Sequence, residues 1–187
     1  MAFAESVTGS KFFTHCQHTL NLVKPVFESQ RHFEDHDLSF LLCLIFIETT
    51  ECFLRGNLPT LKFYVQNEQV VDRYLDLSLP LPPHFYDLCE LSHSLSQKTE
   101  PNIPSVMEAL GRIEWEVVQW RLTHPEDFLE SFTQTEGMHR LAQAHMLNLT
   151  ILLMIHCFRF SFGINDDKGA ILPKCIMREL NSTRIVT

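Results

Sequence analysis

The sequence predicts an all-α fold of layered antiparallel helices, about six to seven in number, around one long central helix. Apolar residues recur at helical spacing through most of the chain, and no segment alternates apolar and polar residues as a half-exposed strand does. Residues 133–160 are apolar on nearly every side, which is typical of a core helix. The 187 residues, 45% hydrophobic and 20% charged, are expected to form one packed domain rather than a disordered chain.

A first helix is expected to begin at Ser10, whose side chain can cap it. Its apolar stripe has helical spacing and consists of Phe12, Phe13, Cys16, Leu20, Val23 and Phe27. Pro25 lacks a backbone donor, so it is expected to kink or split this helix near Lys24. The polar segment 31–37 that follows is expected to be a connection.

A second helix is expected over residues 38–55, capped by Asp35 or Asp37. Gly56 should end it, because glycine readily adopts the left-handed conformation found after a helix. Two faces of this helix are apolar. One carries Leu38, Leu41, Leu42, Ile45 and Cys52, and the other carries Phe40, Leu44, Ile47 and Leu54. Residues 56–60 are interpreted as the end of this helix and the start of the next, a more polar third helix over residues 60–76.

Prolines divide the middle of the chain. Three of them in residues 77–83 exclude both a helix and a central strand there. A fourth helix is expected over residues 84–97, followed by a loop to Pro104. A fifth helix has apolar residues spaced by four, three, four and three, which predicts antiparallel helix packing. These residues are Val106, Leu110, Ile113, Val117 and Trp120.

The central helix is expected to begin at Thr133, with Glu136 completing a capping box. In that motif the threonine hydroxyl accepts the amide of the third helical residue, and the glutamate reaches back to the first amide. Twenty-eight residues at 1.5 Å each would extend for roughly 40 Å. Residues 163–168 are expected to end this helix in a turn, and a last helix is expected over residues 168–184.

Charge and cysteine content narrow the possible function classes. A formal net charge of -8 argues against nucleic-acid binding by this chain alone. No signal peptide is predicted, because the N-terminus lacks a basic start followed by an apolar run. The longest unbroken apolar run, residues 40–47, is far short of the ~20 residues of a membrane span, so no membrane association is expected. The scattered cysteines indicate a reducing compartment, and all six thiols are expected to be free.

One cluster in the connection between the first two helices is a candidate metal site. It consists of His32, Glu34, Asp35, His36 and Asp37, with the two histidines four residues apart. Histidine and carboxylate are common metal ligands. The alternative interpretation is a solvated connection that ends in a helix cap, where acidic residues are favoured by the helix dipole alone.

Other groups are more simply explained by packing. Cys16, flanked by His15 and His18, resembles a thiol and a base, but on a helix His15 points about 100° away from Cys16. Three histidines along the central helix are either packed in the core or line a ligand cavity. They are His139, His145 and His156. Cys43 and Cys52 are the closest cysteine pair, so neither a zinc cluster nor a zinc finger is present.

Two stretches resemble a known family. Residues 48–63, ETTECFLRGNLPTLKF, resemble the helix-Gly-helix junction in the regulatory domain of fungal-specific transcription factors of the zinc-cluster type. Residues 115–163 are similar to its later part, where a Trp-bearing helix and a loop precede a long helix. The corresponding features here are Trp120, Phe132 and Thr133, Glu136, the LAQA segment at residues 141–144, and the His- and Arg-containing end at residues 156–163.

The resemblance implies a single helical regulatory domain over residues 1–187 of a nuclear protein, expected to be a fragment of the full family domain. It implies transcription regulation through effector or coregulator binding, without enzymatic activity or a cofactor. No residue of this chain is therefore assigned a catalytic, metal-binding or DNA-binding role. Possible partners are a coregulator protein, a small-molecule effector or a second copy. The zinc-cluster module is not in this sequence. The alternative is a small helical metal-dependent enzyme that uses the cluster from His32 to Asp37.

Self-association is also expected from packing. The second helix and the central helix are apolar on more than one side, and the other helices supply little cover. The expected contact face carries Phe40, Leu44 and Ile47, opposite the side packed on the central helix. Exposed apolar patches of several hundred Å² mark partner surfaces.

Overall fold

The computed structural model describes most of the chain and contains only helices there. The described residues are 7–29, 35–63, 80–97, 102–121, 130, 132–160 and 167–184. Within them the helices are α1 (Val7–Glu28), α2 (Asp35–Arg55), α3 (Pro82–Gln97), α4 (Ile103–Gln119), α5 (Gln134–Arg159) and α6 (Asp167–Arg184). These ranges contain no strand, so the all-α prediction is confirmed.

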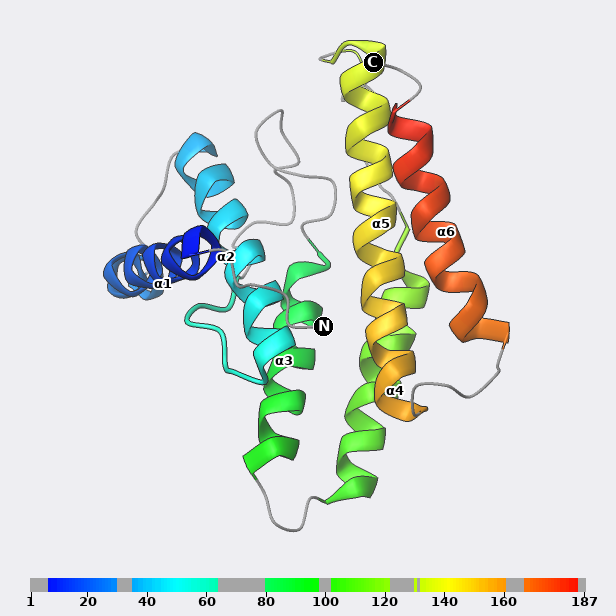
Figure 1. The fold of residues 1–187 in the computed structure, drawn as a ribbon, viewed down its shortest axis with the longest axis horizontal. Helices are drawn as coiled ribbons and strands as arrows, with labels where there is room; N and C mark the ends of the chain where they lie inside the picture. Colours follow the sequence, from blue (N-terminus) through cyan, green and yellow to red (C-terminus); the bar gives the residue numbers. More distant parts are fainter. Residues whose placement is uncertain are drawn as a thin grey trace.

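Four helices form an antiparallel array with α5 at its centre. Successive helices from α3 to α6 alternate in direction (Figure 1). α5 packs against α3, α4 and α6, and its packing is most extensive against α6. The core of this array consists of buried residues of α3, α4 and α5 together with the residue before α3. They are Leu81, Phe85, Leu88, Cys89, Leu110, Ile113, Val117, Leu147, Ile151, Met154 and Ile155.

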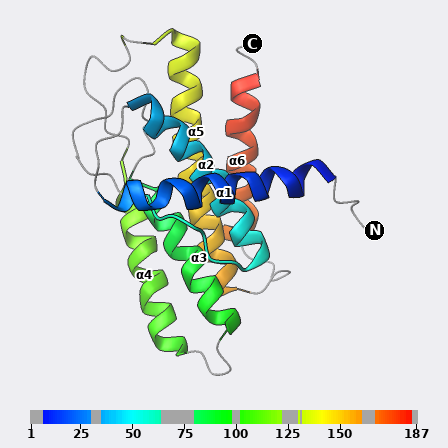
Figure 2. The same cartoon turned by 90° about the vertical axis from the view of Figure 1, so that its left-hand side faces the viewer.

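The pair α1 and α2 has a second core of its own. Cys16, Leu20 and Phe27 of α1 pack against Leu41 and other residues of α2. α1 crosses α2 on the side away from α6 (Figure 2). The pair joins the array mainly through contacts between α2 and α3. The expectation that α2 packs along the central helix is therefore wrong. α2 contacts α5 through Phe53, whose ring meets that of Phe158 edge-on with the ring centroids 6.0 Å apart.

The start of α5 matches the sequence prediction. The Thr133 side chain accepts the Glu136 amide at 3.3 Å, and the Thr133 amide donates to the Glu136 carboxylate at 3.0 Å. α5 then runs without a break through Asn148, whose side-chain amide donates to the carbonyl of Val117 at 2.9 Å. This bond satisfies a polar group inside an apolar helix and fixes α5 against the end of α4.

Three predictions about the boundaries of α1 and α2 are wrong. α1 begins at Val7, so Ser10 lies within the helix and does not cap its start. Pro25 does not split α1, which continues to Glu28. Only one turn follows the proline, and the amide of Ser29 still donates to the Pro25 carbonyl at 3.2 Å, so little backbone bonding is lost. Asp37 is not a cap, because α2 already begins at Asp35.

The predicted end of α2 is confirmed. Gly56 has a φ of +68°, in the left-handed region. The Asn57 amide donates to the Cys52 carbonyl at 2.8 Å, and the Gly56 amide donates to the Phe53 carbonyl at 3.3 Å. These two bonds form a Schellman motif, which satisfies carbonyls that the helix end would leave unpaired.

The third helix expected to begin at residue 60 does not begin there. Residues 61–63 have no helical structure, and residues 64–76 lie outside the described part of the chain. Leu61 and Phe63 are buried in the core shared by α1 and α2, whereas Lys62 between them is half-buried. This alternation with a period of two is typical of an extended segment rather than a helix.

Candidate functional site

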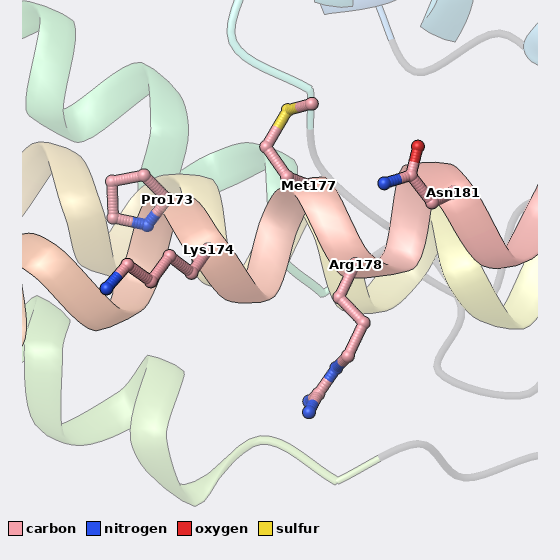
Figure 3. A pocket seen from close by; sticks show the side chains of 5 residues that line it. All are labelled: Pro173, Lys174, Met177, Arg178 and Asn181. Atoms are coloured by element: carbon pink, nitrogen blue, oxygen red, sulfur yellow. The ribbon is translucent and has the colours of Figure 1, made fainter.

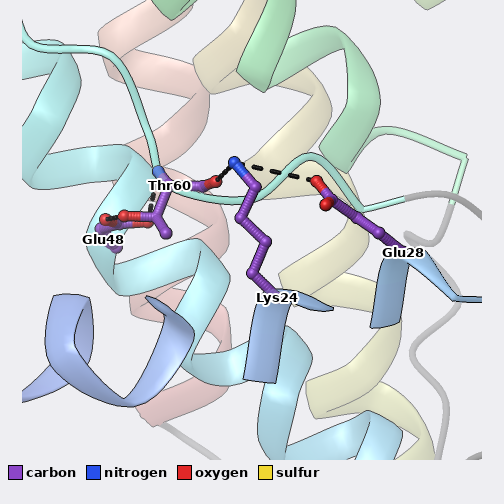
Figure 4. A network of polar contacts seen from close by, with 4 residues as sticks. All are labelled: Lys24, Glu28, Glu48 and Thr60. Atoms are coloured by element: carbon purple, nitrogen blue, oxygen red, sulfur yellow. Dashed lines mark hydrogen bonds and ion pairs between the residues drawn. The ribbon is translucent and has the colours of Figure 1, made fainter. Parts of the chain in front are cut away.

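A buried carboxylate organises the segment after α2. Glu48 of α2 is fully buried (0% exposed) and accepts hydrogen bonds from the amide of Thr60 at 3.0 Å and from its hydroxyl (Figure 4). The Thr60 carbonyl accepts from the Lys24 ammonium at 3.0 Å, and Lys24 also lies 3.8 Å from the Glu28 carboxylate. Thr60 therefore joins α1, α2 and the segment that follows α2.

This network explains why a helix does not begin at Thr60. The amide, hydroxyl and carbonyl of Thr60 are all bonded to side chains from other parts of the chain. The threonine hydroxyl is therefore not available to cap a helix after it. Sequence reasoning missed this role of Glu48, although an acidic residue within the apolar stretch of α2 was the available signal. The arrangement is structural, because both carboxylate oxygens accept hydrogen bonds from Thr60.

The buried cysteines are poor nucleophiles. Burial raises the pKa of Cys52 and of Cys89 to about 12, and the nearby negative charge of Glu48 acts in the same direction. Burial, with Glu48, also raises the pKa of Cys16. A raised pKa keeps a thiol protonated, and the thiolate is the reactive form. All six cysteines are free thiols, as predicted: Cys16, Cys43, Cys52, Cys89, Cys157 and Cys175.

The cysteine and histidine arrangement at α1 does not form a catalytic pair. Cys16 is buried, whereas His15 and His18 are exposed on other faces of α1. Of the candidate metal cluster, His32 and Glu34 lie outside the described residues, and the side chains of Asp35 and His36 are not described either. Among the residues that the structure does describe, no group of three or more His, Cys, Asp or Glu side chains is placed to hold a metal ion.

The three histidines of α5 do not converge on one cavity. His139 is partly buried, and its Nε2 atom has no hydrogen-bond partner. His145 is exposed and lies edge-on to Trp120, with ring centroids 6.2 Å apart. His156, further along the helix, stacks on Phe160 at 4.8 Å. Their spacing of six and eleven residues separates them along the helix axis by roughly 9 and 16 Å.

Ion pairs connect neighbouring elements at the rim of the array. Lys62 pairs with Asp87 of α3, and Arg159 at the end of α5 pairs with Glu114 of α4. His84 of α3 lies 3.5 Å from the Glu116 carboxylate of α4. Burial lowers the pKa of His84, and the negative charge of Glu116 partly opposes that change. These pairs orient neighbouring elements relative to one another.

A shallow depression of about 410 Å³ lies along the outer side of α6. It is lined by Pro173, Lys174, Met177, Arg178 and Asn181, all from that helix (Figure 3). Lys174 and Arg178 extend away from the helix in this view rather than toward a common point. The depression is therefore an open surface with a basic edge and not an enclosed ligand site.

Large exposed apolar side chains lie on several of the described helices, with four on α4 and three each on α2 and α6; those on α2 are Phe40, Phe46 and Leu54. On α4 they are Ile103, Met107, Trp115 and Val118, and on α6 they are Ile171, Met177 and Leu180. Trp115 is 65% exposed, which is unusual for the largest apolar side chain. Surfaces of this kind are typical of contacts with other macromolecules.

The face expected on α2 does not form a continuous exposed surface. Phe40 is 65% exposed, but Leu44 is only 9% exposed and Ile47 packs against the core shared with α1. α1 covers Leu44 and Ile47, because it lies across the side of α2 that was expected to be free. Among the described helices, α4 carries the most exposed large apolar side chains, and α6 carries three more on the array.

No family model, curated protein or solved structure matches this chain. α5 is long and apolar enough to cross a membrane by length and composition, the one such helix among the described residues. A core helix of a soluble protein meets the same criterion, and α5 packs against three other helices.

Proposed function

We propose that this chain is a helical interaction domain that regulates transcription by binding another protein, as its resemblance to the regulatory domains of fungal transcription factors implies. The observation that carries the proposal is the apolar surface on α4 and α6. Seven large apolar side chains are exposed there, on two helices of the array. Such surface is unfavourable in water, and binding a partner would bury it.

The resemblance supports the regulatory part of the proposal. The segment around Gly56 and the start of α5 carry the two resembling stretches, and both have defined structural roles. Gly56 ends α2, and Thr133 caps α5. These residues build the scaffold, and they carry no chemistry of their own. A regulatory domain of this kind needs a stable scaffold and an exposed surface, and it needs no catalytic group.

A reporter assay in a fungal host tests the proposal. The chain is fused to an unrelated DNA-binding domain, and transcription is measured from a promoter that carries sites for that domain. We expect transcription to change several-fold relative to the DNA-binding domain alone. Trp115→Ser and Met177→Ser should each reduce this change, because they replace exposed apolar side chains of α4 and α6. Leu54→Ser is the matched control, since Leu54 is exposed on α2 and outside both surfaces.

Two outcomes would contradict the proposal. The first is unchanged transcription when immunoblots show equal amounts of the fusion and of the DNA-binding domain. The second is stoichiometric, tightly bound metal in the purified protein, which would favour the alternative of a metal-dependent enzyme that uses residues 32–37. A reading frame upstream of Met1 that encodes a C-x2-C-x6-C module would support the assignment to zinc-cluster regulators.

A further inference from the structure

α4 carries a second apolar stripe beside the one that it buries. The buried stripe consists of Leu110, Ile113 and Val117. The exposed stripe consists of Ile103, Met107, Trp115 and Val118, with the partly buried Gly111 between them, and most of these positions are four residues apart. Residues at that spacing lie on one face of a helix. α4 packs on α3 and α5 and lies at an edge of the array (Figure 2), and its four exposed apolar side chains face solvent.

Gly111 lies at the middle of the exposed stripe, where a glycine does not stabilise the helix. Glycine in a helix interior is less stable than alanine by about 1 kcal/mol. A Cβ atom at Gly111 would meet only the Nη2 atom of Arg159, at an ordinary contact distance of 3.9 Å. Packing within this chain therefore does not require a glycine. A second helix that crossed α4 beside the Arg159 side chain would approach the backbone at Gly111 closely, and glycine permits that approach.

Charges along one edge of the stripe are arranged for an antiparallel copy of the same helix. Glu108 and Arg112 are exposed and one turn apart, beside Trp115 on the helix surface. A two-fold axis near Gly111 would place Glu108 of each copy opposite Arg112 of the other. The same axis would place Met107 of each copy against Trp115 of the other. On the opposite edge, Glu114 is already paired with Arg159, so that edge adds little repulsion.

We propose that this chain forms a symmetric dimer through α4, in which two antiparallel copies of the helix cross at Gly111. The inference rests on the proposed function in one respect, since it names a partner for the α4 surface. The contact is isologous, because the same patch is used on both copies, and it therefore closes at two chains. The two reciprocal pairs of Glu108 with Arg112 provide the charge complementarity that fixes the antiparallel direction.

The area of the stripe indicates a weak dimer. Four half-exposed apolar side chains would bury roughly 350 Å² per copy, with aromatic residues alone contributing up to about 150–250 Å² each when fully covered. The total of roughly 700 Å² is below the ~1,000 Å² of a typical stable interface, so a dissociation constant of about 10–100 μM is expected. The dimer would then form only at high local concentration.

Sedimentation equilibrium over about 5–300 μM protein tests the dimer, in the range of its expected dissociation constant. Wild-type protein should fit a monomer–dimer equilibrium, and Trp115→Ser should weaken association at least tenfold. Glu108→Arg and Arg112→Glu should each weaken it, because each places like charges opposite one another. Lys174→Glu on α6 is the matched charge-reversal control, and Leu54→Ser is the matched apolar control; neither should alter association. Circular dichroism of each variant confirms that it remains folded.

Mixing the two charge variants gives the decisive measurement. A mixture of the Glu108→Arg and Arg112→Glu proteins restores both opposite-charge pairs, so it should associate about as well as wild type. The double variant carrying both changes should also regain association. Monomeric wild-type protein at the highest concentration would overturn the inference, as would association that persists in Trp115→Ser or fails to recover on mixing. A monomer that still changes transcription in the reporter assay would overturn the dimer alone and leave the proposed function standing.

Discussion

Replacing Glu48 tests whether the buried carboxylate holds the segment after α2. Glu48→Ala removes the acceptor of two hydrogen bonds from Thr60, one from its amide and one from its hydroxyl. A hydrogen bond to a charged acceptor contributes about 1.5–3 kcal/mol. Part of this loss is offset because a carboxylate no longer has to be desolvated, and Thr60 is only half-buried and can bind water. We expect a net destabilisation of about 3 kcal/mol, a large fraction of the 5–15 kcal/mol of a typical domain.

Matched variants separate the hydrogen bonds from other effects of the substitution. Glu51→Ala removes an exposed carboxylate of the same helix, which is paired with Arg55, and should cost less than about 0.5 kcal/mol. Glu48→Gln keeps one acceptor and should cost about 1–2 kcal/mol. Thr60→Val removes the hydroxyl, and its effect should not add to that of Glu48→Ala, because both delete the same bond.

Urea unfolding followed by circular dichroism at low micromolar protein gives these free energies of unfolding. Hydrogen exchange supplies a local check, since Glu48→Ala should expose the Thr60 amide to exchange before global unfolding. A Glu48→Ala protein as stable as the Glu51→Ala control would refute the argument. Full additivity between Glu48→Ala and Thr60→Val would also refute it.

Three further predictions concern backbone conformation, thiols and capping. Gly56→Ala should destabilise the fold by about 1–2 kcal/mol because its φ is +68°, whereas Gly111→Ala should stabilise it by up to about 1 kcal/mol; thermal melts of the two variants should shift in opposite directions. The pKa values of Cys52 and Cys89 rise from 9.0 to about 12 on folding, so their contribution is complete below pH 9 and is lost as the pH increases from 9 toward 12. Urea unfolding over that range should show stability falling by about 1.4 kcal/mol per pH unit for each thiol, and a flatter profile when either cysteine is replaced by alanine; an unchanged profile would contradict the burial. Thr133→Ala should cost about 1 kcal/mol, and an unchanged urea midpoint would argue against the capping box.

Local signals in the sequence were sufficient to predict most helices. The capping box at Thr133 and the glycine at position 56 mark helix ends through bonds between residues at most five positions apart. Helical spacing of apolar residues predicted the buried stripe of α4, and Leu110, Ile113 and Val117 are indeed buried. Such features depend on residues within one or two helical turns of each other. They can therefore be predicted before the tertiary structure is known.

The exposed apolar surface of α4 was not predicted from the sequence. The exposed stripe of α4 has the same spacing as a core stripe, and the sequence gives no sign that Trp115 faces solvent. The prediction placed the exposed face on α2 instead, where Leu44 proved to be buried. Hydrophobic spacing shows that a face is apolar, but whether it is covered depends on which helices pack beside it.

Thus the sequence by itself determined the helical class, the cap of α5, the end of α2 and the free thiols, because these follow from local bonding and residue type. The tertiary structure decided that α1 rather than α5 covers α2, and that residues 61–63 are not helical. It also decided that α4 lies at an edge of the array. The physical reason is distance along the chain: Glu48 binds Thr60 twelve residues away, and Lys24 binds it across thirty-six. Contacts of that range compete with local helix preference only once the chain has folded.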